Sequence, residues 1–193
     1  MPRGIAHDHS EKRAAIRKGA AAYFAANGYN RASMTGASAH CGVSKALVYH
    51  YYDSKDALLY DILHTHLSDL VETVANVPAS DDRLRLLVHA ILLAYRDADA
   101  EHKLQADAMI ALPAEKRKPL MELQRRLIQM MSDALLAASP ETLKNPARLR
   151  PVTMTVFGML NWFYMWHRPG KGIGREEYAN LVTDMVMGGI KGL

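Results

Sequence analysis

The sequence contains only one cysteine, Cys41, among its 193 residues. A single cysteine cannot form an intrachain disulfide, which fits a reducing compartment. Residues 1–11 are polar and contain no apolar run, so we expect no signal peptide. The most apolar stretch, 152–166, is interrupted by polar residues and is shorter than the ~20 residues that a membrane-spanning helix needs. These absences predict a cytoplasmic protein with no membrane partner.

The sequence also lacks the signatures of common catalytic and metal sites. It has no nucleophile elbow and no pair of histidines at metal-ligand spacing on a helix, and the three glycines in 170–174 follow no predicted strand. His7 and His9 lie close together, but a zinc site needs three or four converging ligands. We therefore expect no enzymatic activity, no metal and no cofactor. A small helical enzyme remains the least favoured alternative.

Signals for β-strands are absent as well, because no segment shows sustained two-residue alternation. Apolar residues instead recur every three or four positions, which is typical of helices packed on a core. The pattern predicts an all-α fold with about nine helices. We expect them at 8–27, 34–41, 45–52, 55–76, 81–98, 101–112, 115–138, 151–167 and 175–191, with 139–150 a loop that holds at most one helical turn.

Residues at the expected helix ends support these bounds. Asp8, with Glu11 three residues later, has the spacing of a capping box. Gly28 follows the first helix and can adopt the left-handed conformation that ends one. Pro151 suits the first turn of the eighth helix. Three serines are expected to cap the second, third and fourth helices: Ser33, Ser44 and Ser54.

Positive charge is concentrated near the start of the chain. Residues 1–55 contain eight Lys or Arg against three Asp or Glu, a net charge of +5, whereas 56–193 have a net charge of −1. This asymmetry predicts a basic module joined to a nearly neutral body, with an anionic partner such as nucleic acid. We place the boundary between residues 1–54 and 55–193, with no flexible linker between them.

Residues 33–52 have the spacing of a helix-turn-helix. Ala39 is small enough for close helix approach, Gly42 supplies the turn, and Val43 and Val48 can anchor the second helix. The exposed side of that helix is then left to Lys45, Ala46, Leu47, Tyr49 and His50. Exposed apolar and aromatic residues on a short helix indicate a recognition helix for the DNA major groove.

Residues 28–29, 39–45, 49–52 and 54–58 together resemble the TetR family of one-component bacterial regulators over about residues 10–60. The resemblance implies an all-helical homodimer in which three N-terminal helices bind DNA. The remaining helices would form a ligand pocket and a dimer bundle. The DNA-binding residues that it implies are Ser33, Thr35, Ser44, Lys45, Ala46, Leu47, Tyr49, His50, Tyr51 and Lys55.

Some positions leave alternatives open. Ser38 stands where the family usually has a large aliphatic residue, and Tyr52 is expected in the core. Leu47 either reads thymine methyl groups or packs beside the backbone. The basic residues of the first helix form either a solvated face or a set of phosphate contacts: Arg13, Arg17 and Lys18.

The helix expected at 151–167 is apolar around almost its whole circumference, so it must be buried on more than one side. The last helix carries glycines that allow close approach. We therefore predict a four-helix dimer interface built from these two helices of each subunit. The predicted interface residues are Met159, Trp162, Phe163, Trp166, Leu181, Met185 and Gly189.

The family resemblance implies a ligand pocket among the middle helices, although the pattern favours a place in the core for each of its residues taken singly. Eleven methionines offer adaptable apolar walls. The predicted lining is His66, His89, Tyr95, Gln105, Met109, Met130, Phe157 and Asn161. A hydrophobic or aromatic small molecule would suit such walls.

These observations predict a transcriptional repressor that releases a palindromic DNA operator when a small-molecule effector binds its C-terminal part. A DNA-binding architectural protein or activator without an inducer is the alternative from a second functional class.

Overall fold

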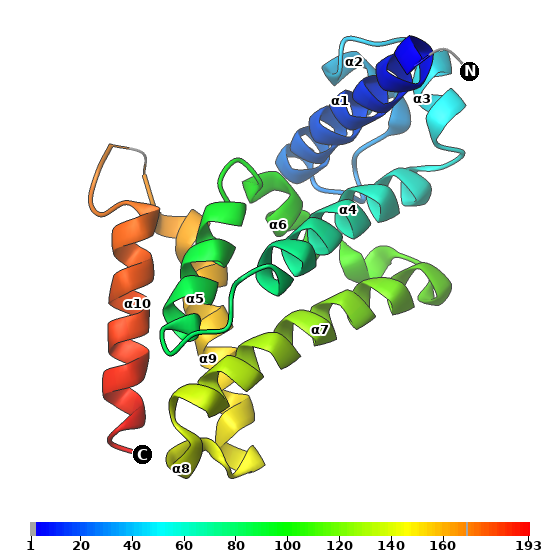
Figure 1. Cartoon of the computed structure of the whole chain (residues 1–193). Coiled ribbons are helices and arrows are strands. Elements are labelled where there is room, and N and C mark those ends of the chain that lie inside the picture. Colours follow the sequence, from blue (N-terminus) through cyan, green and yellow to red (C-terminus); the bar gives the residue numbers. More distant parts are fainter. Residues whose placement is uncertain (1–2, 169) are drawn as a thin grey trace. The chain divides into compact units, whose positions relative to one another are not determined.

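The computed structural model describes residues 3–168 and 170–193. In these residues the chain forms ten α-helices and one 3-10 turn, with no strand longer than an isolated bridge, so the all-α prediction is confirmed. Figure 1 shows the helices in chain order. Their bounds are α1 (Arg3–Asn27), α2 (Met34–His40), α3 (Lys45–Tyr51), α4 (Lys55–Ala75), α5 (Arg83–Ala94), α6 (Asp99–Asp107), η1 (Met109–Ala111), α7 (Ala114–Ala138), α8 (Pro140–Leu143), α9 (Pro146–Trp166) and α10 (Arg175–Ile190).

The predicted serine caps are confirmed by hydrogen bonds at the starts of three helices. The hydroxyls of Ser33, Ser44 and Ser54 each accept a backbone N–H three residues later, at 3.0–3.1 Å. Each serine thereby satisfies a donor that has no partner inside its helix. Gly28 ends α1 with a φ of +77° and Gly42 turns the chain after α2 with a φ of +67°, both in the left-handed region that favours glycine.

Two predicted helix starts were wrong. α1 begins at Arg3, so Asp8 lies within the helix instead of capping it. α9 begins at Pro146, because the Asn145 side chain accepts the Ala147 N–H at 2.9 Å and proline suits the first helical position. Pro151 therefore lies inside α9, where its missing N–H removes one helical hydrogen bond.

The chain divides into two compact units. The first contains residues up to His66 together with 98–120, and the second contains 67–97 and 121–193. Helices α4 and α7 contribute residues to both. The predicted boundary between a DNA-binding part (1–54) and a ligand-binding and dimerisation part (55–193) is not tested by this division into packed units, and it stays a prediction.

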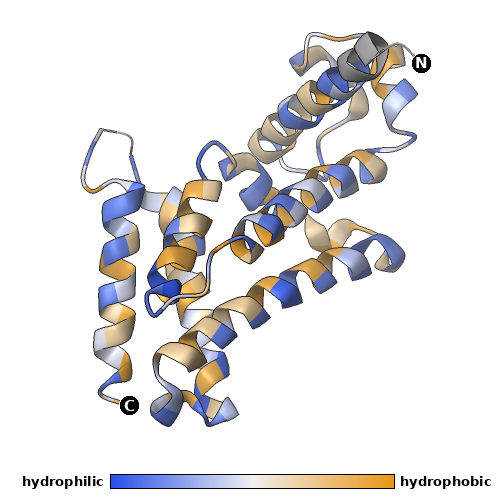
Figure 2. Cartoon of the chain, viewed as in Figure 1, coloured by the Kyte–Doolittle hydropathy of each residue, from blue (hydrophilic) through white to orange (hydrophobic). Residues whose placement is uncertain are grey.

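The first unit is built around α1, which packs on α2 and α6. Ile16, Ala20 and Phe24 follow one another along the buried face of α1. Leu58 and Ile62 supply buried apolar residues from α4. The helices show the mixture of apolar and polar colour that amphipathic helices give (Figure 2).

The second unit has α10 packed on α5 and α9. Its buried residues recur at helical spacing, with Leu84, Leu87, Val88 and Ile91 on α5. In its core, the buried Thr153 hydroxyl lies 2.9 Å from the Ser132 hydroxyl on α7, so these two polar groups are paired. Across the described residues, no helix is both long and apolar enough to cross a membrane.

Candidate nucleic-acid interface

Helices α2 and α3 form the predicted helix-turn-helix. The turn is held by backbone hydrogen bonds from the Gly42 N–H to Ala39 at 3.1 Å and from the Val43 N–H to Ser38 at 3.0 Å. Val48 is fully buried, so it anchors α3 to the rest of the unit as expected. The opposite side of α3 is thereby kept at the surface.

Close approach of α1 and α2 depends on two glycines that the sequence analysis did not single out. A Cβ at Gly36 would overlap the Tyr23 hydroxyl, and one at Gly19 would lie 2.6 Å from the Cys41 sulfur. Ala39, which was expected to allow close approach of α2 and α3, is exposed. The prediction for Ala39 was therefore wrong, because α2 presents Ala37 and Ser38 to the core instead.

The outer face of α3 carries four of the ten residues expected to contact DNA. Lys45, Ala46, Tyr49 and His50 are exposed, and 42% of Tyr49 is accessible to solvent. The Lys45 ammonium lies 5.6 Å from the centre of the Tyr49 ring, so the cation and the aromatic group occupy one surface. A cation beside an aromatic ring is suited to phosphate and base contacts.

Leu47 differs from its neighbours on α3. It is half-buried and lines a small hollow of about 70 Å³ with residues of α1 and the turn, including Ile16, Cys41 and Val43. This geometry supports the second of the two interpretations, in which Leu47 packs beside the backbone. Cys41 is half-buried, and burial raises the pKa of its thiol.

The end of α3 is tied to α1 through an aromatic cluster. The His9 ring lies 4.6 Å from that of Tyr51 and 6.0 Å from that of His50, measured between ring centres. The Tyr51 hydroxyl also donates to the His9 carbonyl at 3.4 Å. His9 thus packs on α3, and among the described residues no group of three or more potential ligands could hold a metal. The side chain of His7 lies outside the described residues.

The start of α2 presents Ser33 and Thr35 at the surface. The Ser33 hydroxyl is engaged as the helix cap described above. Ser38 is buried, and its hydroxyl donates to the Thr35 carbonyl at 2.8 Å. That hydrogen bond satisfies the polar group, which explains how a serine occupies a position where an aliphatic residue is usual.

Lys55 holds the connection between α1 and α2. Its ammonium donates to the carbonyls of Tyr29 at 2.9 Å and Ala32 at 3.0 Å, and lies 3.5 Å from that of Asn30. It also lies 4.4 Å from the centre of the Tyr29 ring, whose hydroxyl donates to Asp56. The three ammonium donors are therefore used within the chain, and the expected phosphate contact of Lys55 stays a prediction.

The basic residues of α1 face acidic partners of the same unit. Asp61 on α4 accepts from Arg13 at 2.8 Å, lies 3.6 Å from Arg17, and accepts from the Tyr52 hydroxyl at 2.7 Å. Burial and the Asp61 hydrogen bond raise the pKa of Tyr52 to about 12. Lys18 pairs with Glu101 on α6 at 3.2 Å. The side chains of Arg13 and Lys18 stay 47% and 58% exposed in these ion pairs, so the solvated face and the phosphate contacts both stay predictions.

The residues of the predicted ligand pocket are divided between the two units. His66, Gln105 and Met109 belong to the first, and His89, Tyr95, Met130, Phe157 and Asn161 belong to the second. Within the second unit, the Tyr95 hydroxyl donates to the Asn161 side chain at 3.0 Å. The His89 ring lies 2.9 Å from the Asn180 side-chain oxygen on α10, so His89 faces that helix.

His66 has a buried partner that the sequence analysis missed. The ring of His102 on α6 lies 6.2 Å from that of His66, and both residues are buried. Burial, with smaller effects from His102 and Lys18, lowers the pKa of His66 to about 4. No spacing signal links positions 66 and 102, because only the tertiary fold brings them together.

Most predicted interface residues on α9 and α10 are exposed apolar side chains. Trp162 is 61% and Met185 59% accessible, and Trp166 and Leu181 are also exposed. Met159, Met185 and Gly189 line an apolar groove of about 310 Å³ together with Val152, Thr155, Val186, Ile190 and Leu193.

Phe163 is the exception among the predicted interface residues. It is buried inside the unit and stacks on His167, with 4.4 Å between ring centres, and the Arg175 guanidinium lies 4.9 Å from its ring centre. Its assignment to the interface was therefore wrong. Met154 and Met165, which were not predicted, are exposed on α9 instead.

Comparison with known proteins identifies the architecture. Residues 16–62 match the family model of bacterial regulatory proteins of the tetR family, and 78–190 match that of the tetracyclin repressor-like C-terminal domain. Both units therefore contain segments with a family counterpart.

Solved structures agree with these matches. A TetR-family transcriptional regulator from Bordetella parapertussis is 33% identical with a TM-score of 0.86, covering 94% of this chain and 96% of that one. PfmR from Thermus thermophilus is 24% identical with a TM-score of 0.78, covering 89% of this chain and 96% of that one. AibR, solved with isovaleryl coenzyme A and operator DNA, is 24% identical with a TM-score of 0.77, covering 90% of this chain and 97% of that one. The chain belongs to the TetR family of bacterial transcriptional regulators.

Proposed function

We propose that this regulator is a dimeric repressor that binds a palindromic operator and releases it when a small hydrophobic or aromatic molecule binds the C-terminal body. The observation that carries the proposal is the two-sided character of α3. Val48 is fully buried on one side, while Lys45, Tyr49 and His50 are exposed on the other. A helix held in this way can enter the major groove without losing its own support.

Dimerisation rests on the exposed apolar surface of α9 and α10. Trp162 and Met185 are large, apolar and more than half accessible, and a patch of this kind marks a site of protein association. A two-fold dimer would present two copies of α3, and half-sites one helical turn of DNA apart require a separation of about 34–36 Å.

A small-molecule effector is supported by the likeness to AibR, which was solved with isovaleryl coenzyme A and operator DNA. In this chain Tyr95 and Asn161 form a polar pair among buried apolar residues such as Phe157. A site with apolar walls and a few oriented polar groups suits a small ligand. Helix α4 contributes to both units, so it would carry the change from the body to the DNA-binding helices.

Selection of genomic fragments by the purified protein, followed by footprinting, tests the proposal. We expect a protected palindrome and an affinity that falls steeply with salt, since phosphate contacts release counterions. Lys45→Gln should reduce the slope of log K against log salt by about 1 for each phosphate that the lysine neutralises. Lys118→Gln is the matched control, because Lys118 is an exposed lysine on α7. A protected site without symmetry, or equal slopes for both variants, would argue against this function.

A further inference from the structure

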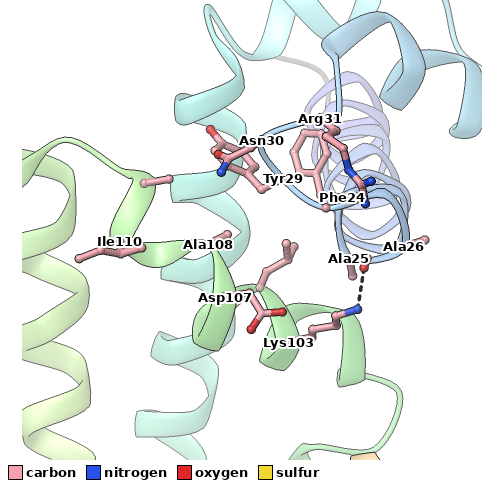
Figure 3. Close-up of a pocket in the computed structure, with 13 residues that line it drawn as sticks. Phe24, Ala25, Ala26, Tyr29, Asn30, Arg31, Lys103, Asp107, Ala108 and Ile110 are labelled. Atoms are coloured by element: carbon pink, nitrogen blue, oxygen red, sulfur yellow. Dashed lines mark hydrogen bonds between the residues drawn. The ribbon is translucent and has the colours of Figure 1, made fainter.

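A cleft of about 510 Å³ lies within the first unit, apart from the body residues assigned to the effector. One side is formed by the end of α1 and the turn that follows it, and the other by α6 and η1 (Figure 3). Phe24, Leu104 and Ala108 are buried beneath it, and Ile110, which is 75% exposed, is its accessible large apolar side chain. Its volume falls within the range of small-molecule sites.

Two cations line this cleft, Arg31 from the turn after α1 and Lys103 from α6. The Lys103 ammonium donates to the Ala25 carbonyl at 3.0 Å, the contact drawn in Figure 3, and the Arg31 Nε donates to the Asn27 carbonyl at 3.2 Å. Each side chain is thereby held against the carbonyl end of α1. Two ammonium hydrogens and the terminal guanidinium nitrogens remain for a ligand, since no other described residue accepts from them.

Gly28 lies beside the Arg31 guanidinium. Its φ of +77° is a backbone conformation that other residues rarely adopt, and a Cβ at this position would lie 3.6 Å from an Arg31 terminal nitrogen. Arg31 is exposed, and its planar guanidinium fork matches the geometry of a carboxylate.

The remaining charge in the lining is that of Asp107. Its carboxylate makes no hydrogen bond or ion pair with any described residue, and Arg31 and Lys103 outnumber it. A ligand with one anionic group and an apolar chain would complement a cleft that has two cations and apolar side chains in its lining. We propose that this cleft binds a small monocarboxylate with an apolar chain, as a second ligand site in addition to the proposed effector site of the body.

A ligand in the cleft would contact the segment that positions the helix-turn-helix. Tyr29, Asn30 and Arg31 line the cleft, and α2 starts three residues after Arg31. Lys55 holds the carbonyls of the same turn from α4. The occupant would therefore contact the segment that leads into the DNA-binding helices directly.

Calorimetric titration of the full-length protein with sodium octanoate tests this site. We expect saturable binding, with octan-1-ol at least about tenfold weaker because it lacks the charge that Arg31 and Lys103 recognise. Inorganic phosphate, which has charge but no apolar body, should also bind more weakly than octanoate. Equal affinities for octanoate and octan-1-ol would overturn the assignment of an anion site.

Variants locate the binding within the molecule. Arg31→Gln should weaken octanoate about tenfold, and Asp107→Asn should tighten it, since it removes the like charge. Ala111→Trp, at an exposed position in the lining, should abolish binding by filling the cleft. Lys118→Gln should change nothing, and circular dichroism melting should show that each variant is folded.

Binding to the body alone gives a different result. Octanoate affinity would then survive both Arg31→Gln and Ala111→Trp, which would overturn the cleft site while leaving the proposed repressor function intact. Absence of saturable octanoate binding to the wild-type protein would overturn it as well. Loss of operator binding with retained octanoate binding would contradict only the proposed function.

Discussion

The Tyr52 hydroxyl donates a 2.7 Å hydrogen bond to the Asp61 carboxylate. Tyr52 directly follows α3 and Asp61 lies on the second turn of α4, so the bond joins the end of the recognition helix to the next helix. Arg13 reaches the same carboxylate from α1 at 2.8 Å. One acidic side chain therefore holds three helices of the first unit in a common arrangement.

Asp61→Asn should lower the free energy of unfolding by about 1–2 kcal/mol. The amide can still accept from Tyr52, but it removes the charge that pairs with Arg13 and Arg17, and Arg13 is partly exposed, which limits the loss. Urea denaturation measures the change. Asp69→Asn, at an exposed position of α4, is the control, and an equal effect of both variants would contradict the role of Asp61.

Acid should destabilise the protein through His66. Its pKa is about 4 in the folded chain against an ordinary 6.5, so between these values the unfolded chain binds the extra proton. Stability is therefore fully present above about pH 6.5 and is lost as pH falls toward 4, by up to about 3 kcal/mol. His102 and Lys18 oppose protonation from α6 and α1.

His66→Gln should flatten this pH dependence of the unfolding free energy. His64→Gln is a suitable control, because His64 lies on the same helix with its ring 5.4 Å from that of Tyr60 and is only half-buried. Urea denaturation at several pH values measures this dependence for both variants. A slope that persists in the His66 variant would show that another group is responsible.

Lys55→Gln should loosen the connection between α1 and α2. The substitution removes the ammonium from three backbone carbonyls and from the Tyr29 ring, at a cost of about 1–3 kcal/mol. Hydrogen exchange should be faster at the amides of Arg31 and Ala32, which bond to the Gly28 carbonyl. Unchanged exchange in this segment would mean that Lys55 does not order it.

Met185→Glu should convert the proposed dimer into a monomer. A carboxylate placed in the apolar groove of α9 and α10 would have to be buried without a partner in the interface. Sedimentation velocity gives the mass directly. Met121→Glu, at an exposed methionine of α7, should leave the mass unchanged, and a dimeric Met185→Glu protein would place the interface elsewhere.

Local features were the most predictable part of the fold. Ser33, Ser44 and Gly42 follow rules that involve only three or four neighbouring residues, and the structure places all three as expected. The start of α9 was missed although Asn145 and Pro146 carry the same kind of signal, because Pro151 offered a second possible start.

Features that depend on long-range packing could not be predicted. Asp61 meets Arg13 across 48 residues of sequence, and no periodic pattern connects them. Lys55 was expected at a phosphate because its position resembles one in the family, whereas the fold brings three carbonyls to it first. Phe163 was assigned to a surface because its helix is apolar all round, which leaves its inward and outward sides indistinguishable in sequence.

Operator affinity of the Tyr49→Ala variant is the most direct test of the central claim that α3 reads DNA. The measurement is fluorescence anisotropy on the palindrome selected by the wild-type protein, with the mass and melting curve of the variant recorded in parallel. We predict at least about a tenfold loss of affinity in a variant that remains folded and dimeric. Wild-type affinity in such a variant would contradict it.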